Sequence, residues 1–325
     1  MNNYCTLFNS NYLPRGLLMY KSLIDYQPNA HLFIFPFDEE CCAILEEMNL
    51  SNATIVSLRE FENETLLNLK KNRTMTEYCW TCTPWIIDYV FRYFKVDSCT
   101  YIDADIYFFG DSSVLIQEMP SRFSVLITPH RYSEEYNQAE TSGIFCVQYL
   151  YFKNNFDGKE VLGWWKDACT DWCFNRLEDG KFGDQKYLDD WPQRFVDKIW
   201  ILQNKGGGVA PWNLQQYEFK IHNRKIKGVE KTSKEIFEVI FFHFHACSLK
   251  KHFGLFNENI FLNYFSGYNL TLSSIECFYK PYEKMLVRES LFLKKNYSLT
   301  INFSNETSFN ICGFLNSKFK RLFFN

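Results

Sequence analysis

Three apolar, strand-like runs alternate with amphipathic helical stretches at the start of this 325-residue chain. The runs cover residues 4–8, 31–37 and 53–58, and the stretches 17–24 and 39–48 between them place apolar residues at helical spacing. Strands separated by helices are joined by crossover connections, which make neighbouring strands parallel. The sequence therefore predicts an α/β fold with one mostly parallel sheet flanked by helices on both faces.

Polar residues stand where these strands end. Asn9, Ser10 and Tyr12 follow the first strand, and Asp38 follows the second. Sheets of this kind bind ligands outside the carboxyl ends of their strands. No G-x-G-x-x-G follows the first strand, so a nicotinamide cofactor is not expected.

In the segment CTYIDADIYFF at residues 99–109, residues 99–102 read as a buried strand, which is followed by two acids and then by a second apolar run. Asp103 and Asp105 are two positions apart, so in an extended chain they project to the same side. Two carboxylates at the end of a buried strand are costly unless a cation offsets them. We expect a divalent metal with oxygen ligands, whose open positions take a substrate phosphate.

Later segments add further polar groups. Asp184 and Gln185 follow a pair of glycines and precede a short helix, and residues 204–213 form a glycine-rich loop suited to close approach of a ligand. His243 and His245 alternate along a late strand at residues 240–245.

In order and spacing these motifs resemble GT-A glycosyltransferases, most like the bacterial family-8 group, over residues 4–255. The most specific parts are Tyr-Ile-Asp-Ala-Asp-Ile-Tyr-Phe-Phe and Gly-Asp-Gln. Two positions depart from that family. Its late His-x-x-Gly-x-x-Lys-Pro-Trp is present only as His245-Ala-Cys-Ser-Leu-Lys250, and Cys146 or a neighbour stands where the family often has Asn.

The resemblance implies a single GT-A type, Rossmann-like domain at residues 1–255. Its nucleotide half covers about 1–110 and its acceptor half about 111–255. Residues 256–325 are expected to form a helical C-terminal extension, because 273–295 show an amphipathic helical pattern.

The resemblance also implies roles for the metal and phosphate groups. Asp103 and Asp105 would bind the ion with His245 as the third ligand, and His243 is the alternative. A mixed oxygen and imidazole ligand set favours Mn²⁺ over Mg²⁺. Lys250, or its neighbour Lys251, would meet the phosphates.

Asp184 and Gln185 are expected beside the sugar. In a retaining reaction, which the resemblance favours, Gln185 faces the reacting carbon and Asp184 holds sugar hydroxyls; in an inverting one Asp184 is the general base. Alternatively, Asp184 only caps the following helix. Arg73 would reach the diphosphate or lie solvated on the surface. The candidates for the nucleoside are Thr6, Asn9, Tyr12 and Asp38.

The implied reaction moves a sugar from a nucleoside-diphosphate sugar to a hydroxyl of a glycan or glycolipid, in bacterial surface polysaccharide synthesis. A sugar-1-phosphate nucleotidyltransferase is one alternative, although residues 4–16 lack its Gly-rich, Arg-containing phosphate loop. A non-catalytic carbohydrate-binding protein is another, although binding alone needs no acidic pair. A thiol oxidoreductase using Cys79 and Cys82 is a third, and packing at a helix start is the simpler interpretation of those cysteines.

Composition limits partners and compartment. A net charge of −3 gives no sign of nucleic-acid binding. Cysteines within apolar runs and the lack of an export signal indicate reduced thiols in the cytoplasm. The basic and aromatic tail at 318–325 suits an anionic membrane at the inner face, or packs on the domain.

Overall fold

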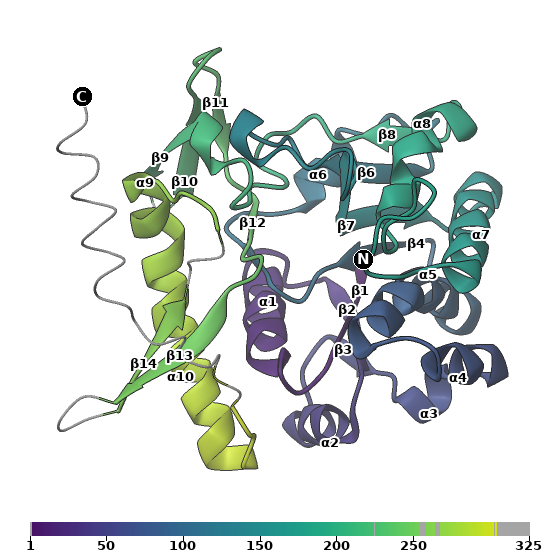
Figure 1. Cartoon of the computed structure of the whole chain (residues 1–325), viewed down its shortest axis with the longest axis horizontal. Coiled ribbons are helices and arrows are strands. Elements are labelled where there is room, and N and C mark those ends of the chain that lie inside the picture. The colour runs from purple at the N-terminus through teal and green to yellow at the C-terminus, as the bar shows by residue number, and fades with distance from the viewer. Residues whose placement is uncertain (1, 224, 254–257, 264–266, 302, 304–325) are drawn as a thin grey trace.

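A seven-stranded sheet forms the centre of the computed structural model, which describes residues 2–223, 225–253, 258–263, 267–301 and 303. The strand order is β3-β2-β1-β4-β7-β6-β8 (Figure 1). β7 runs antiparallel to both of its neighbours, and the other six strands share one direction. The predicted mostly parallel sheet is confirmed. The strands are β1 Asn3–Phe8, β2 His31–Pro36, β3 Ala53–Ile55, β4 Ser98–Ile102, β6 Val125–Pro129, β7 Phe145–Lys153 and β8 Ile199–Ile201.

Helices cover both faces of this sheet because successive strand residues point to opposite sides. Tyr4 and Phe8 of β1 pack into one core with α1 and α2, whereas Cys5 and Leu7 pack into a second core with α5 and α7. The helices are α1 Leu13–Tyr26, α2 Glu39–Met48, α3 Leu58–Phe61, α4 Glu64–Lys70, α5 Met75–Phe94, α6 Ser113–Gln117, α7 Phe156–Asp171 and α8 Trp191–Arg194.

A two-stranded antiparallel sheet lies beside the carboxyl edge of β4. Its strands are β5 Ile106–Phe108, which directly follows the acidic motif, and β12 Phe241–His243. Two further small sheets complete the strands: β9 Tyr217–His222, β10 Lys225–Glu230 and β11 Ile236–Glu238 in one, β13 Ser248–Phe253 and β14 Glu258–Asn263 in the other.

The C-terminal helical segment packs against these small sheets and shares one hydrophobic core with them (Figure 1). Helical structure is continuous from α9 Leu272–Ser274 through a π-helical turn, Ile275–Tyr279, to α10 Lys280–Tyr297. This confirms the helix predicted over 273–295, and strand β14 is an addition to the helical extension. The tail at 318–325 lies outside the described residues.

Aromatic side chains from this segment hold β12 from one side. Phe242 stacks on Phe278 with ring centroids 4.4 Å apart, and Phe244 stacks on Tyr282 at 3.6 Å. His243, between the two phenylalanines, therefore projects to the opposite side. Within the described residues, each helix is too short or too polar to cross a bilayer.

Candidate active site

The acidic pair lies in the turn between β4 and β5. The Asp103 backbone N–H donates to the carbonyl oxygen of Gln148 in β7 at 3.1 Å, which fixes the start of the turn. The Asp105 carbonyl accepts from the Phe244 N–H at 2.9 Å, next to the point where His243 lies opposite Ile106. Pairing of β12 with β5 thus carries a histidine from far along the chain to the two acids.

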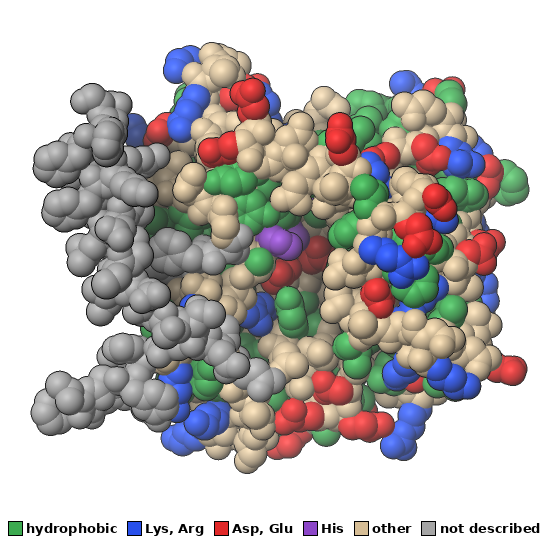
Figure 2. Space-filling model, in the orientation of Figure 1, with side chains coloured by type: hydrophobic (Ala, Val, Ile, Leu, Met, Phe, Trp, Pro, Cys, Tyr) green, Lys and Arg blue, Asp and Glu red, His purple; other side chains and the backbone are tan. Residues whose placement is uncertain are grey.

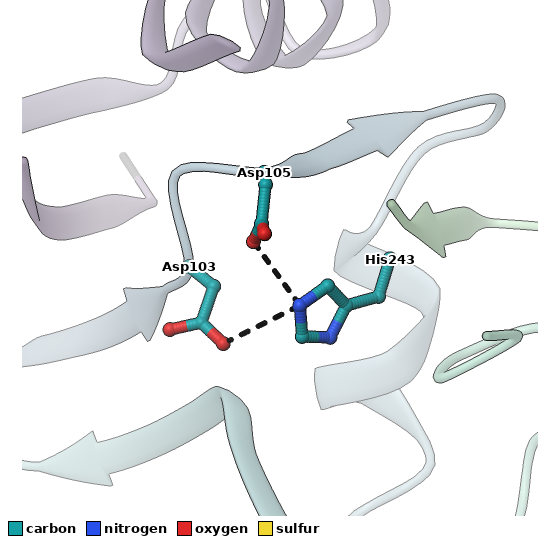
Figure 3. Close-up of side chains that lie close together, drawn as sticks. All are labelled: Asp103, Asp105 and His243. Atoms are coloured by element: carbon teal, nitrogen blue, oxygen red, sulfur yellow. Dashed lines mark ion pairs between the residues drawn. The ribbon is translucent and has the colours of Figure 1, made fainter. Parts of the chain in front are cut away.

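Asp103, Asp105 and His243 form a compact group of candidate metal ligands (Figure 3). The His243 Nε2 atom is 3.1 Å from Asp105 Oδ1 and 3.9 Å from Asp103 Oδ2. One ligand atom from each residue lies within 4.8 Å of the other two. The Tyr101 hydroxyl donates to Asp103 Oδ1 at 2.8 Å, which orients that carboxylate.

The charges of this group favour a bound positive charge. Burial raises the pKa of Asp103 to about 6, helped by the charge of Asp105. Burial opposes ionisation of Asp105 too, but His243 outweighs it and lowers the pKa of Asp105 to about 2. Burial alone would lower the pKa of His243, yet the Asp105 carboxylate keeps it well above its ordinary value. In the metal-free protein the imidazolium is the counter-charge, and two carboxylates with one imidazole are a donor set that suits a divalent ion in its place.

His245, the expected third ligand, lies beside this group and not within it. Its ring centroid is 5.7 Å from that of His243 and 5.5 Å from that of Trp212, and the side chain is exposed. The structure therefore brings the alternative, His243, to the two acids.

The group opens into a cavity of about 580 Å³. Figure 2 shows the hollow, with acidic and histidine side chains at its floor. The described residues that line it include no lysine or arginine. Seven of the predicted site residues line this one cavity: Asn9, Tyr12, Asp103, Asp105, Asp184, Gln185 and His245.

Asp184 and Gln185 reach the cavity on a short turn after Gly183, whose φ is +53°. The Asp184 carbonyl accepts from Trp165 Nε1 at 2.8 Å. Burial raises the pKa of the Asp184 carboxyl to about 7, although a hydrogen bond with Thr83 acts in the opposite direction. The 3₁₀-helix that follows, Lys186–Asp190, has no side-chain cap, so the capping interpretation of Asp184 is wrong.

Gln185 is anchored by one end of its amide. Its Nε2 atom donates to the Ser142 carbonyl at 2.7 Å, and the residue lines the cavity. The amide carbonyl oxygen is thus the end that remains for a ligand.

Of the four residues predicted for the nucleoside, Asn9 and Tyr12 line the cavity, and Asn9 Oδ1 is buried without a partner among the described residues. The charge of Asp105, followed by burial, raises the pKa of Tyr12 to about 12. Thr6 is fully buried, and Asp38 accepts from the backbone N–H groups of Ser10 and Cys41 at 2.8 and 2.7 Å. Thr6 and Asp38 are not among the lining residues.

The two predicted phosphate cations lie elsewhere. The Arg73 guanidinium donates to the carbonyls of Cys169 and Thr170, both at 2.8 Å, and to the Thr81 hydroxyl. It ties the start of α5 to the end of α7 and is neither solvated nor at the cavity. Lys250 lies in β13 opposite Phe261, also outside the lining.

Two other sequence features have structural roles. Cys79 and Cys82 are free thiols inside α5, and burial raises the pKa of Cys79 to about 12, which disfavours a reactive thiolate. The glycine-rich loop, expected to approach a ligand, instead packs against protein. A Cβ at Gly206 would lie 1.9 Å from the Glu238 carbonyl oxygen, and one at Gly207 would lie 2.7 Å from Leu202.

Sequence reasoning missed several residues of the site. His130, Tyr132 and Trp212 form an aromatic wall of the cavity, with the His130 ring stacked on Tyr132 at 4.5 Å. Gln148 contacts His243 from below. No local pattern marks these residues, because they come from separate parts of the chain: His130 and Tyr132 follow β6, Gln148 is in β7, and Trp212 is in the loop after β8.

Comparison with known proteins assigns the matched part of the chain. The model of glycosyl transferase family 8 matches residues 4–152. Residues 4–152 are thus similar to glycosyl transferase family 8. The match confirms the recognition of a family 8 glycosyltransferase, and with the sheet described above it supports the GT-A type fold. Glycosyl transfer is therefore the class of activity.

Two curated relatives come from Bacillus subtilis (strain 168). The chain is 29% identical over 248 residues to "Uncharacterized protein YfnF", which covers 74% of this chain and 80% of that protein. It is 26% identical over 261 residues to "Uncharacterized protein YfnD", and this match covers 78% of this chain and 81% of that protein. The matches to these two relatives are therefore longer than the match to the family model and extend past residue 152.

Solved structures are similar at low identity. The galactosyltransferase LgtC, in complex with donor and acceptor sugar analogs, is 13% identical with a TM-score of 0.46, covering 74% of this chain and 86% of that chain. The glycosyltransferase GlyE of Streptococcus pneumoniae TIGR4 is 16% identical with a TM-score of 0.44, covering 64% and 46%. This chain therefore spans less than half of GlyE.

Proposed function

We propose that this chain transfers a sugar from a nucleoside-diphosphate sugar to a hydroxyl of a glycan or glycolipid, with the help of a divalent metal. One observation carries the proposal. The three candidate ligands Asp103, Asp105 and His243 lie at the floor of the same cavity that Asp184 and Gln185 line. A metal site and polar groups for a sugar are thus in one place.

The charges of the cavity support a metal-dependent donor. Its described lining offers the carboxyl groups of Asp103, Asp105 and Asp184 and no lysine or arginine, so a diphosphate needs another source of positive charge. A divalent ion, bound, supplies Lewis-acid stabilisation of the departing diphosphate. We propose Mn²⁺, or Mg²⁺, held by the two aspartates and His243. Tyr101 keeps the Asp103 carboxylate oriented by its hydrogen bond.

We propose a retaining outcome, with Gln185 and Asp184 beside the sugar. The Gln185 amide is held through its nitrogen, so its carbonyl oxygen can face positive charge that develops on the reacting carbon. Asp184 is buried, and its pKa is raised to about 7. Its carboxyl group can therefore accept a hydrogen bond from a sugar hydroxyl, or donate one when it is protonated.

The remaining assignments are proposals of the same kind. Asn9 and Tyr12, after β1, hold the nucleoside, which assigns residues 1–110 to the donor and 111–255 to the acceptor. We propose a bacterial surface polysaccharide as the acceptor; both curated relatives come from a bacterium. We further propose that the enzyme works in the cytoplasm, with its tail against an anionic membrane.

A panel of nucleotide sugars tests this function. Each is incubated with the protein and Mn²⁺, and melting temperature and donor hydrolysis are measured, because a ligand of the native state raises the melting temperature. We expect one donor to shift melting and to be hydrolysed only with metal. Asp105→Asn should remove both effects. Asp88→Asn is the matched control, since Asp88 pairs with Lys166 and Arg92 away from the cavity. No response to any nucleotide sugar, with Mn²⁺ or Mg²⁺, refutes the proposal.

A further inference from the structure

Gln148, in the antiparallel strand β7, contacts two of the three candidate ligands. Its side chain is fully buried, and its Oε1 atom lies 2.8 Å from the Nδ1 atom of His243. Its backbone carbonyl accepts from the Asp103 N–H at 3.1 Å. A single residue thus holds a histidine and an aspartate that are far apart in the sequence.

A glutamine at this buried position lowers the stability of the folded protein. The strand around it is apolar and buried, and within the described residues the Gln148 Nε2 atom is buried without a hydrogen-bond partner. An unsatisfied buried donor costs about 1–3 kcal/mol, which an apolar side chain would avoid. The cost points to a role for the other end of the amide.

The neighbouring loop leaves room for this amide. Gly208 has a φ of +96°, a conformation that favours glycine. A Cβ at Gly208 would lie 2.9 Å from Thr128 Cγ2 and 3.3 Å from Gln148 Nε2. The third glycine of the loop therefore accommodates the glutamine, which gives the glycine run a purpose in the site.

The contact has a definite chemical consequence for His243. A neutral imidazole carries one proton, and the hydrogen bond of one ring nitrogen decides which atom keeps it. An oxygen acceptor at Nδ1 keeps the proton there and leaves the Nε2 lone pair free. The Nε2 atom is the one that faces Asp105 and Asp103, at 3.1 and 3.9 Å.

We propose that Gln148 is a positioning residue that selects the Nδ1–H tautomer of His243 and so presents Nε2 to the metal. This inference rests on the proposed metal-dependent function. Gln148 is neither a lining residue of the cavity nor one of the three candidate ligands. It acts through His243, and outer partners of this kind typically account for 10–100-fold in metal affinity.

The test measures the metal alone. Mn²⁺ is titrated into the full chain, free Mn²⁺ is followed by electron paramagnetic resonance, and spin-echo spectra report nitrogen coordinated to the bound ion. Gln148→Met keeps the volume and removes the acceptor, and we expect about 10–100-fold weaker Mn²⁺ binding with loss of the nitrogen signal. Gln148→Glu keeps an acceptor and should retain both affinity and signal. Gln148→Leu replaces the methionine variant if that folds poorly.

Gln27→Met is the matched control. Gln27 is also a buried glutamine, and it hydrogen bonds Tyr4, Ser112 and Asn2 away from the acids. It should lower stability and leave Mn²⁺ affinity and the nitrogen signal unchanged, which separates a structural effect from a positioning effect.

The outcomes distinguish the two proposals. If the wild-type chain binds no Mn²⁺, the metal-dependent function fails and the role of Gln148 fails with it. If the wild type binds Mn²⁺ through nitrogen and the Gln148→Met or Gln148→Leu protein does so equally well, only the role of Gln148 is overturned. Loss of the nitrogen signal in Gln148→Glu would overturn it as well.

Discussion

Replacing Asp184 by asparagine should stabilise the metal-free protein at pH 8 while it removes turnover. The Asp184 carboxyl is 5% exposed, and burial raises its pKa from an ordinary 3.8 to about 7. Each pKa unit corresponds to about 1.4 kcal/mol, so ionised Asp184 costs the folded state about 4 kcal/mol. Asparagine keeps the shape and the hydrogen-bonding capacity toward Thr83, and it removes that cost.

The pH dependence follows from the sign of the shift. Because the pKa is higher in the folded than in the unfolded chain, the cost is fully present above pH 7. It falls as the pH drops and folded Asp184 takes up its proton, which leaves about 1–2 kcal/mol at pH 5. The advantage of Asp184→Asn should therefore shrink by more than half between pH 8 and pH 5.

Urea unfolding with a chelator, at both pH values, measures this difference. Donor hydrolysis with Mn²⁺ is followed on the same samples. Asp38→Asn is the control, since the Asp38 carboxylate accepts from two backbone N–H groups and its loss should lower stability. An Asp184→Asn protein that is no more stable than the wild type at pH 8, or equally favoured at pH 5, would refute the reasoning.

Three further predictions concern the ion site and α5. Asp105→Asn should lower the stability of the metal-free protein by about 3–5 kcal/mol in urea unfolding, because His243 loses its buried counter-charge. Mn²⁺ binding should weaken as the pH falls through 6, where Asp103 takes up a proton, and titrations at pH 5.5 and 7.5 measure this. Arg73→Ala should lose about 2–3 kcal/mol of stability with unchanged donor affinity by calorimetry, since Arg73 hydrogen bonds α7 and not the cavity. Unchanged stability of Asp105→Asn or of Arg73→Ala would contradict the corresponding prediction, and so would Mn²⁺ binding that does not depend on pH.

Much of the architecture follows from periodicity in the sequence. Apolar runs separated by helical stretches specify a parallel sheet, and the carboxyl ends of such strands meet at one edge. Strand direction alone therefore predicts that Asp103 and Asp105 lie near Asn9 and Tyr12, and all four line the one cavity. These residues need only their own strand and its direction to be located.

The choice between His243 and His245 could not be made in this way. Alternation along a strand puts both histidines on one side. The structure favours His243 because β12 ends there and is in register with Ile106 of β5, whereas His245 lies beyond the strand, next to Ala246 with its φ of +56°. Strand ends and registers are set by partners distant in the chain.

Arg73 and Gln148 show the same limit. An arginine before a helix looks available to a phosphate, but the carbonyls of Cys169 and Thr170 occupy its guanidinium. The sequence gives no reason for a glutamine in an apolar strand. The structure does, because Gln148 lies in β7, which pairs with β4, and its side chain contacts His243. Contacts with segments that are distant in the sequence determine the roles of Arg73 and Gln148, and local sequence patterns do not predict such contacts.

The pairing of β5 with β12 has a consequence for motion in the native state. Asp105 and His243 bracket residues 106–242, so an ion shared by them would act as a removable cross-link that closes a very long chain segment. Amide hydrogens of β5 and β12 should then exchange slowly when the ion is bound and faster when a chelator takes it away. Binding of the ion would thus be measurable as slower opening of the backbone hydrogen bonds between β5 and β12.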